Sequence, residues 1–162
     1  MFVTVRLIIN LATSLNWAME QADIDTAFLW SDIEEDIYMQ QPEGHVDPIH
    51  PDYVCKLLKS LYGLKQAAQL WNQLLSKTLR AAGYQQLLTD TNCFVKTDQQ
   101  GTTAIIGVHV DDLLIATRTD ALIKQTIRDL QQHFQIKELG PVQLLLGIAV
   151  QRDREAGTTL IH

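Results

Sequence analysis

The chain has 162 residues, enough for one compact domain with a hydrophobic core, and its 46% apolar and 20% charged residues are ordinary for a globular protein. No stretch approaches the roughly 20 continuous apolar residues of a membrane span, and no signal-peptide pattern is present, so neither a membrane protein nor a secreted one is expected. The formal net charge of −6 is unfavourable for a nucleic-acid enzyme, because phosphate contacts usually need a basic face. Either the acidic residues gather at a metal site and other parts of a longer protein supply basic surface, or the chain binds no nucleic acid.

Helical and strand-like periodicities follow one another along the chain without strict alternation. The predicted elements, in chain order, are a helix at residues 3–16, strands at 17–24, 37–39 and 54–58, a helix at 65–82, strands at 93–96, 102–110 and 113–116, a helix at 120–134, and strands at 144–151 and 158–161. Residues 44–52, which contain two prolines, predict a loop. Because helices and strands do not alternate regularly, the pattern indicates an α+β fold rather than a doubly wound sheet.

The two cysteines, Cys55 and Cys93, stand far apart in the sequence. Neither has CxxC spacing or a neighbouring cluster of histidines. This argues against a zinc site and a disulfide framework, and it fits a reducing intracellular compartment.

Two adjacent carboxylates, Asp111 and Asp112, interrupt a strongly apolar stretch of the sequence. Apolar residues precede them at 105–110 and follow them at 113–116, so the pair lies at the turn of a predicted hairpin. An unpaired carboxylate close to a core is costly, and a bound divalent cation would offset that cost. An exposed turn is the alternative, since Asp is a favoured turn residue, and the pair alone does not separate the two interpretations.

A third carboxylate, Asp23, lies at the end of the strand predicted at residues 17–24. If this strand neighbours the hairpin, the three carboxylates converge, and Mg²⁺ prefers oxygen ligands of this kind, shared with substrate phosphates. Two such ions about 4 Å apart can hold the attacking and leaving oxygens of a phosphoryl transfer. Asp25 competes with Asp23, because residues two apart share a face of a strand.

Four sequence blocks resemble, in order and spacing, the motifs of copia-type retrotransposon reverse transcriptases. The blocks are Ala22–Leu29 with Asp32–Gly44, Lys59–Ala67, Val108–Leu114, and Lys137–Gly140 with Leu146–Ile148. They cover nearly the whole chain, and their combination is highly specific. The resemblance implies an α+β reverse-transcriptase palm, an antiparallel sheet packed on helices, with partial fingers and no thumb. It also implies that residues 1–162 are a single domain of a Pol polyprotein, truncated at both ends.

The resemblance gives the carboxylates a role as metal ligands. Asp23, Asp111 and Asp112 would bind two Mg²⁺ ions, with Mn²⁺ as an alternative, and the backbone carbonyl of Ile24 would add an oxygen ligand. In this family such a site transfers a nucleotide to a primer 3′-hydroxyl. It is the resemblance, and not the spacing, that selects Asp23 over Asp25.

The resemblance also places residues around the incoming dNTP. Phe28 would be the steric gate that rejects a ribose 2′-hydroxyl; without the motif, an ordinary core aromatic is the simpler interpretation. Tyr62 and Gly63 would contact the nucleotide, with Gly63 allowing close backbone approach. Lys65 would face phosphate, although a single Lys is more often a solvated surface charge. Residues 146–147 would support the primer end, or are a strand glycine beside a core leucine.

The implied function is RNA-directed DNA polymerase activity, with an RNA or DNA template, a primer and dNTPs as partners. The fingers, thumb and ribonuclease H regions of the parent polyprotein would be further partners. No membrane is expected, and the location would be intracellular, in a cytoplasmic virus-like particle. A second hypothesis is a non-catalytic, degenerate remnant that at most binds partners. A third hypothesis is a different palm-type nucleotidyl enzyme, such as a cyclase. Such enzymes share paired carboxylates but lack the block at residues 61–65.

Some positions depart from the family pattern. His109 stands where the family has Tyr, and Ala68 and Gln69 stand where it has Pro and Arg. Residues 30–31, Trp and Ser, replace the usual Asn-Gly. These changes leave the predicted metal ligands intact but remove a rigid turn and a cation near the template, which favours the remnant hypothesis.

Overall fold

The computed structural model describes residues 2–99 and 101–162, and over these residues the chain folds as two compact units. The first, here called the sheet unit, combines the residues up to Asp25 with Leu75–His162. The second, the loop unit, is Thr26–Leu74. The predicted mixture of helices and strands is confirmed.

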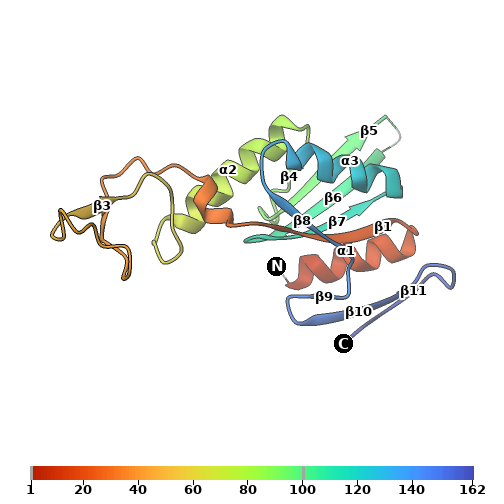
Figure 1. Cartoon of the computed structure of the whole chain (residues 1–162). Coiled ribbons are helices and arrows are strands. Elements are labelled where there is room, and N and C mark those ends of the chain that lie inside the picture. The colour runs from red at the N-terminus through yellow and green to blue at the C-terminus, as the bar shows by residue number, and fades with distance from the viewer. Residues whose placement is uncertain (1, 100) are drawn as a thin grey trace. The chain divides into compact units, whose positions relative to one another are not determined.

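An antiparallel sheet, six-stranded over the described residues, forms the centre of the sheet unit (Figure 1). Its strand order is β4-β5-β6-β7-β1-β8. The strands are β1 (Ala18–Ile24), β4 (Gln85–Gln86), β5 (Cys93–Asp98), β6 (Gly101–His109), β7 (Asp112–Thr117) and β8 (Ile136–Pro141). Strand β7 is buried on both faces from Leu113 onward, because other elements cover each side of the sheet.

Helices lie on both faces of this sheet. Helix α1 (Phe2–Ser14) contacts β1, β6 and β7, and α3 (Asp120–Gln131) contacts β1, β7 and β8. Figure 1 shows α1 and α3 on opposite faces of the sheet. Helix α2 (Ala67–Ala81) begins in the loop unit and ends in the sheet unit. The three helices predicted from periodicity are confirmed to within three residues at each end. No helix among the described residues has the length and apolar character needed to cross a membrane.

Side-chain alternation decides which sheet residues face α1. Met19 of β1, Ile105 of β6 and Leu114 of β7 belong to one buried core together with α1 residues. Because every second residue of a strand shares a face, Asp23 projects from the same side as Met19, and Asp112 from the same side as Leu114. Both carboxylates therefore stand on the α1 face of the sheet.

A smaller antiparallel sheet, with strand order β11-β10-β9, extends the same core. Its strands are β9 (Leu144–Leu145), β10 (Ile148–Asp153) and β11 (Thr158–Ile161), and β11 contacts α1. The single strand predicted at 144–151 is wrong: the chain reverses at Leu146 and Gly147, which both have positive φ, at 51° and 77°. A continuous apolar run carries no signal for such a reversal. Strands β4 and β8 were not predicted, because their sequences lack an alternating apolar pattern.

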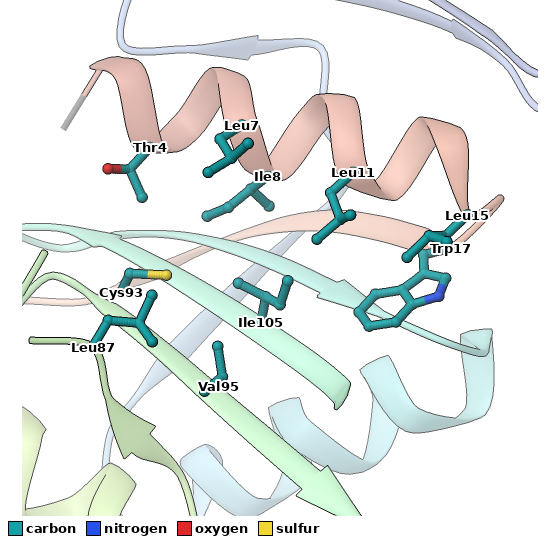
Figure 2. Close-up of a pocket in the computed structure, with 10 residues that line it drawn as sticks. All are labelled: Thr4, Leu7, Ile8, Leu11, Leu15, Trp17, Leu87, Cys93, Val95 and Ile105. Atoms are coloured by element: carbon teal, nitrogen blue, oxygen red, sulfur yellow. The ribbon is translucent and has the colours of Figure 1, made fainter. Parts of the chain in front are cut away.

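An apolar pocket of about 460 Å³ opens between α1 and the sheet (Figure 2). Leu7, Leu11 and Leu15 line it from the helix, and Cys93 and Ile105 line it from the strands. Leu7 is 64% exposed and Leu15 51%, so α1 closes this part of the sheet only partly.

The loop unit contains little regular structure. It begins with the 3₁₀ helix η1 (Ala27–Trp30), and β2 (Tyr38–Gln40) pairs antiparallel with β3 (Val54–Lys56). The loop predicted at residues 44–52 is confirmed.

Candidate active site

Two of the predicted metal-ligating carboxylates meet across neighbouring strands. Strand β1 pairs with β7 in a register that puts Asp23 directly opposite Asp112. Residues opposite one another in an antiparallel pair have Cα atoms about 4.5–5.5 Å apart. The expectation that the two strands are neighbours is thus confirmed.

The third carboxylate, Asp111, lies in the tight turn between β6 and β7. His109 pairs with Asp112, so Val110 and Asp111 alone form the turn. Of these two residues only Val110 has positive φ, at 58°, which is the pattern of a type II′ hairpin. The backbone carbonyl of Asp111 accepts a hydrogen bond of 3.0 Å from the N–H of Ile24, which ties the turn to the end of β1.

Asp25, the competing candidate, lies just beyond the end of β1. Its backbone N–H donates a hydrogen bond of 3.0 Å to the carbonyl of Gln135, the residue before β8, so this bond ties Asp25 to the β8 neighbour of β1 and not to β7. The register therefore gives Asp23, and not Asp25, a partner position opposite the hairpin carboxylates.

Negative charge is concentrated around Asp23. Partial burial raises the pKa of this carboxyl, and the nearby carboxylates of Asp111, Asp112 and Asp25 raise it further. Lys137 of β8, which lies directly opposite Asp23, opposes the rise. The register thus forms a row across four neighbouring strands, from His109 through Asp112 and Asp23 to Lys137.

The carboxylate oxygens of these residues are the ligand type that a hard divalent cation prefers, but they do not form a complete coordination shell. Among the described residues, no group of three or more His, Cys, Asp or Glu side chains is arranged to hold a metal ion. Mg²⁺, however, is usually bound by one or two carboxylates and completes its shell with water and substrate phosphates. The facing pair Asp23 and Asp112, with Asp111 at the adjoining turn, fits that kind of site.

The predicted nucleotide-contacting residues lie in the loop unit. Phe28 of η1 is half-buried, and its ring packs against that of Tyr62, with centroids 4.4 Å apart and planes tilted by 53°. Gly63 has φ of 99° and open space where a Cβ would stand, so the turn conformation, rather than a close neighbour, requires glycine here. Lys65 is exposed.

The predicted primer-end segment forms a turn. Leu146 and Gly147 connect β9 to β10, with Leu146 half-buried against the core below α1. They belong to the sheet unit, as do the three carboxylates.

Comparison with known protein families identifies the family of this chain. The model of a family described as "Reverse transcriptase (RNA-dependent DNA polymerase)" matches residues 1–161. The chain belongs to the reverse transcriptase family.

Polyproteins of transposable elements are similar to this reverse transcriptase. It is 40% identical to the "Retrovirus-related Pol polyprotein from transposon TNT 1-94" of Nicotiana tabacum, over 93% of this chain and 11% of that protein. It is 38% identical to the "Retrovirus-related Pol polyprotein from transposon RE2" of Arabidopsis thaliana, over 92% of this chain and 10% of that protein. It is 29% identical to the "Transposon Ty1-NL2 Gag-Pol polyprotein" of Saccharomyces cerevisiae, over 80% of this chain and 7% of that protein.

These matches confirm the resemblance to copia-type retrotransposon reverse transcriptases. The chain spans about a tenth of the length of the plant relatives that it matches.

Two side chains beside the carboxylates received no role in the sequence analysis of this reverse transcriptase. Gln21 donates a hydrogen bond from Nε2 to Oδ1 of Asp112, at 3.1 Å. Lys137 lies opposite Asp23. A period-2 count from Asp23 places Gln21 on the same face, but only strand pairing shows which carboxylate it reaches.

Proposed function

We propose that this reverse transcriptase chain is the palm, with part of the fingers, of an RNA-directed DNA polymerase, and that Asp23, Asp111 and Asp112 are its catalytic carboxylates. The observation that carries the proposal is the register that sets Asp23 opposite Asp112, with Asp111 in the adjoining turn. Charge-bearing residues at the end of an otherwise buried hairpin are costly to the fold, so a functional reason for their position is favoured.

Holding divalent cations is the task that the carboxylates would perform. Bound Mg²⁺ ions, or Mn²⁺, would lower the pKa of a primer 3′-hydroxyl and stabilise the charge of the triphosphate. Asp23 and Asp112 would supply ligand oxygens from two strands that hydrogen bonds hold in fixed register. Asp111 would supply oxygens from the turn, whose backbone is tied to Ile24. The carbonyl of Ile24 would be a further ligand.

Selection of the nucleotide would fall to the loop unit. The rings of Phe28 and Tyr62, which pack against each other at a tilt of 53°, form an aromatic surface. Such a surface, placed against the sugar of a dNTP, would exclude a 2′-hydroxyl. Gly63 would let the turn after Tyr62 come close to the nucleotide, and Lys65 would face its phosphates.

Template and primer would be held largely by other regions of a longer polyprotein. The net charge of −6 leaves this chain poor in phosphate-binding surface. The fingers, thumb and ribonuclease H regions of such a polyprotein would supply it, and the enzyme would act within a virus-like particle in the cytoplasm.

The departures from the family pattern favour a second candidate, a non-catalytic remnant. His109 pairs with Asp112 where the family has Tyr. Ala68 and Gln69, which replace Pro and Arg, are exposed in the first turn of α2. Neither change replaces a carboxylate, so the polymerase remains the better-supported function.

Primer extension on an RNA template with Mg²⁺ tests the proposal, using a Pol polypeptide that carries this chain together with fingers and thumb regions. We expect Asp23→Asn and Asp112→Asn each to lower kcat by more than about 100-fold, because outer-shell partners of a metal alone are worth about 10 to 100-fold. Asp25→Asn should cost less than about tenfold. Equal losses at Asp23 and Asp25 would contradict the site assignment, and a Pol polypeptide that folds but is inactive would establish the remnant.

A further inference from the structure

Gln21 makes a side-chain contact with a proposed metal ligand. It lies in β1, half-buried, two residues before Asp23 and on the same face of the sheet. Its Nε2 donates to Oδ1 of Asp112 across the strand pair, at 3.1 Å. We propose that Gln21 is a positioning residue, which holds the Asp112 carboxylate in the orientation that binds a divalent cation. This inference rests on the proposed function.

The strand register explains why a side chain of this length is needed. Gln21 lies opposite Leu114, and Asp112 is two residues before Leu114 in β7. Diagonal neighbours of this kind are about 7–8 Å apart, within reach of long side chains only. The two methylenes of Gln21 span the diagonal, and an Asn at this position would fall short.

The chemistry of the amide also suits the position. An N–H donor satisfies one carboxylate oxygen without adding a charge, so the second oxygen stays available to a cation. A carboxylate at position 21 would repel Asp112, and an ammonium would compete with the cation for it. The neutral donor is the side-chain type that orients Asp112 and still leaves it negative.

The surroundings of Asp112 make orientation necessary. Asp23 lies directly opposite and repels it when both are ionised, which favours rotamers that turn the two carboxylates apart. A hydrogen bond to one oxygen restricts this rotation before any cation arrives. Hydrogen-bonding partners of metal ligands commonly act in this way.

Binding of Mn²⁺ to the 162-residue chain, followed by electron paramagnetic resonance, tests the inference. The informative variant is Gln21→Met, which keeps the length of the side chain and removes the donor. Gln151→Met is the matched control, because Gln151 is an exposed strand glutamine of β10. We expect Gln21→Met to weaken Mn²⁺ binding by about tenfold or more, and Gln151→Met to leave it unchanged.

A double-mutant cycle separates positioning from a merely structural role. In an Asp112→Asn background, Gln21→Met should cause no further loss of Mn²⁺ affinity, since the group that it positions is gone. If Gln21→Met does not fold, Gln21→Asn, whose amide is too short for the diagonal, should show the same loss.

The outcomes distinguish a failure of the positioning role of Gln21 from a failure of the proposed metal site. If Asp112→Asn weakens Mn²⁺ binding while Gln21→Met matches its control, the positioning role is overturned and the proposed active site stands. If Asp112→Asn itself binds Mn²⁺ as the wild type does, the proposed site fails and the inference fails with it.

Discussion

Asp23 of β1 lies directly opposite Asp112 of β7, beside the fully buried pair Ala22 and Leu113. Partial burial is costly to a carboxylate, and a like charge at the opposed position of the sheet adds to the cost. Both effects raise the pKa of Asp23. This pairing is a local cost to the fold that a bound cation would offset.

Replacing Asp23 should therefore stabilise the metal-free protein. The folded-state pKa of Asp23 lies above its unfolded value, near 3.8, so the ionised group costs stability at neutral pH. As the pH falls through the folded-state pKa, protonation removes this cost. We expect Asp23→Asn to have the higher free energy of unfolding at pH 7 in EDTA, with the advantage shrinking toward pH 4. Urea unfolding across this range measures it, and a less stable variant at pH 7 would refute the account.

The turn that carries Asp111 contains a strained residue. Val110 is β-branched and has φ of 58°, a conformation that costs an L-residue about 1–2 kcal/mol. Val110→Gly should raise the free energy of unfolding by about 1 kcal/mol and Tm by about 2–4 °C. Val108→Gly is the control: Val108 is 3% exposed in β6, so the same change should destabilise. A fall in Tm for Val110→Gly would mean that turn strain is not the dominant effect.

Close packing of α1 on the sheet depends on Gly107. A Cβ at this position would lie 2.9 Å from Cδ1 of Ile8. Because Cδ1 is the end of the Ile8 side chain and can shift in part, Gly107→Ala should cost about 1 kcal/mol by overpacking. Ile8→Val removes the opposing atom, so the double variant should be more stable than the sum of the single effects predicts, by at least about 0.5 kcal/mol. Chemical unfolding of the four proteins in the cycle measures this coupling, and strict additivity would contradict the contact.

The two cysteines should differ in reactivity. Burial raises the pKa of the Cys93 thiol to about 11, with a smaller contribution from Asp90. Because the thiolate is the reactive form, Cys93 should react far more slowly than the half-buried Cys55 with a thiol reagent at pH 8. Timed labelling of the native protein, with Cys55→Ser as the control, checks this. Full labelling of Cys93 should require denaturant, and rapid labelling of native Cys55→Ser would disprove it.

Local sequence was sufficient to predict those elements whose apolar pattern repeats within a single helix or strand. The apolar spacing of α1, α2 and α3 gave their bounds, since helix formation depends on residues three and four positions apart. The hairpin that carries Asp111 and Asp112 was predicted for a similar reason, because two apolar strands flank the carboxylate pair. Its turn consists of Val110 and Asp111, one residue earlier than the predicted pair, and Asp112 begins β7. Reversal of the chain at Leu146 and the polar edge strand β8 were not predicted, because pairing partners and not local pattern specify them.

The sequence by itself determined the family, the hairpin carboxylates and the helices, since these are encoded in motifs and periodicities of contiguous residues. Only the tertiary structure decided that Asp23, rather than Asp25, lies opposite Asp112, and that Gln21 and Lys137 adjoin the pair. The physical reason is that strand register sets these neighbours, and register follows from burying one face of β1, β6 and β7 against α1.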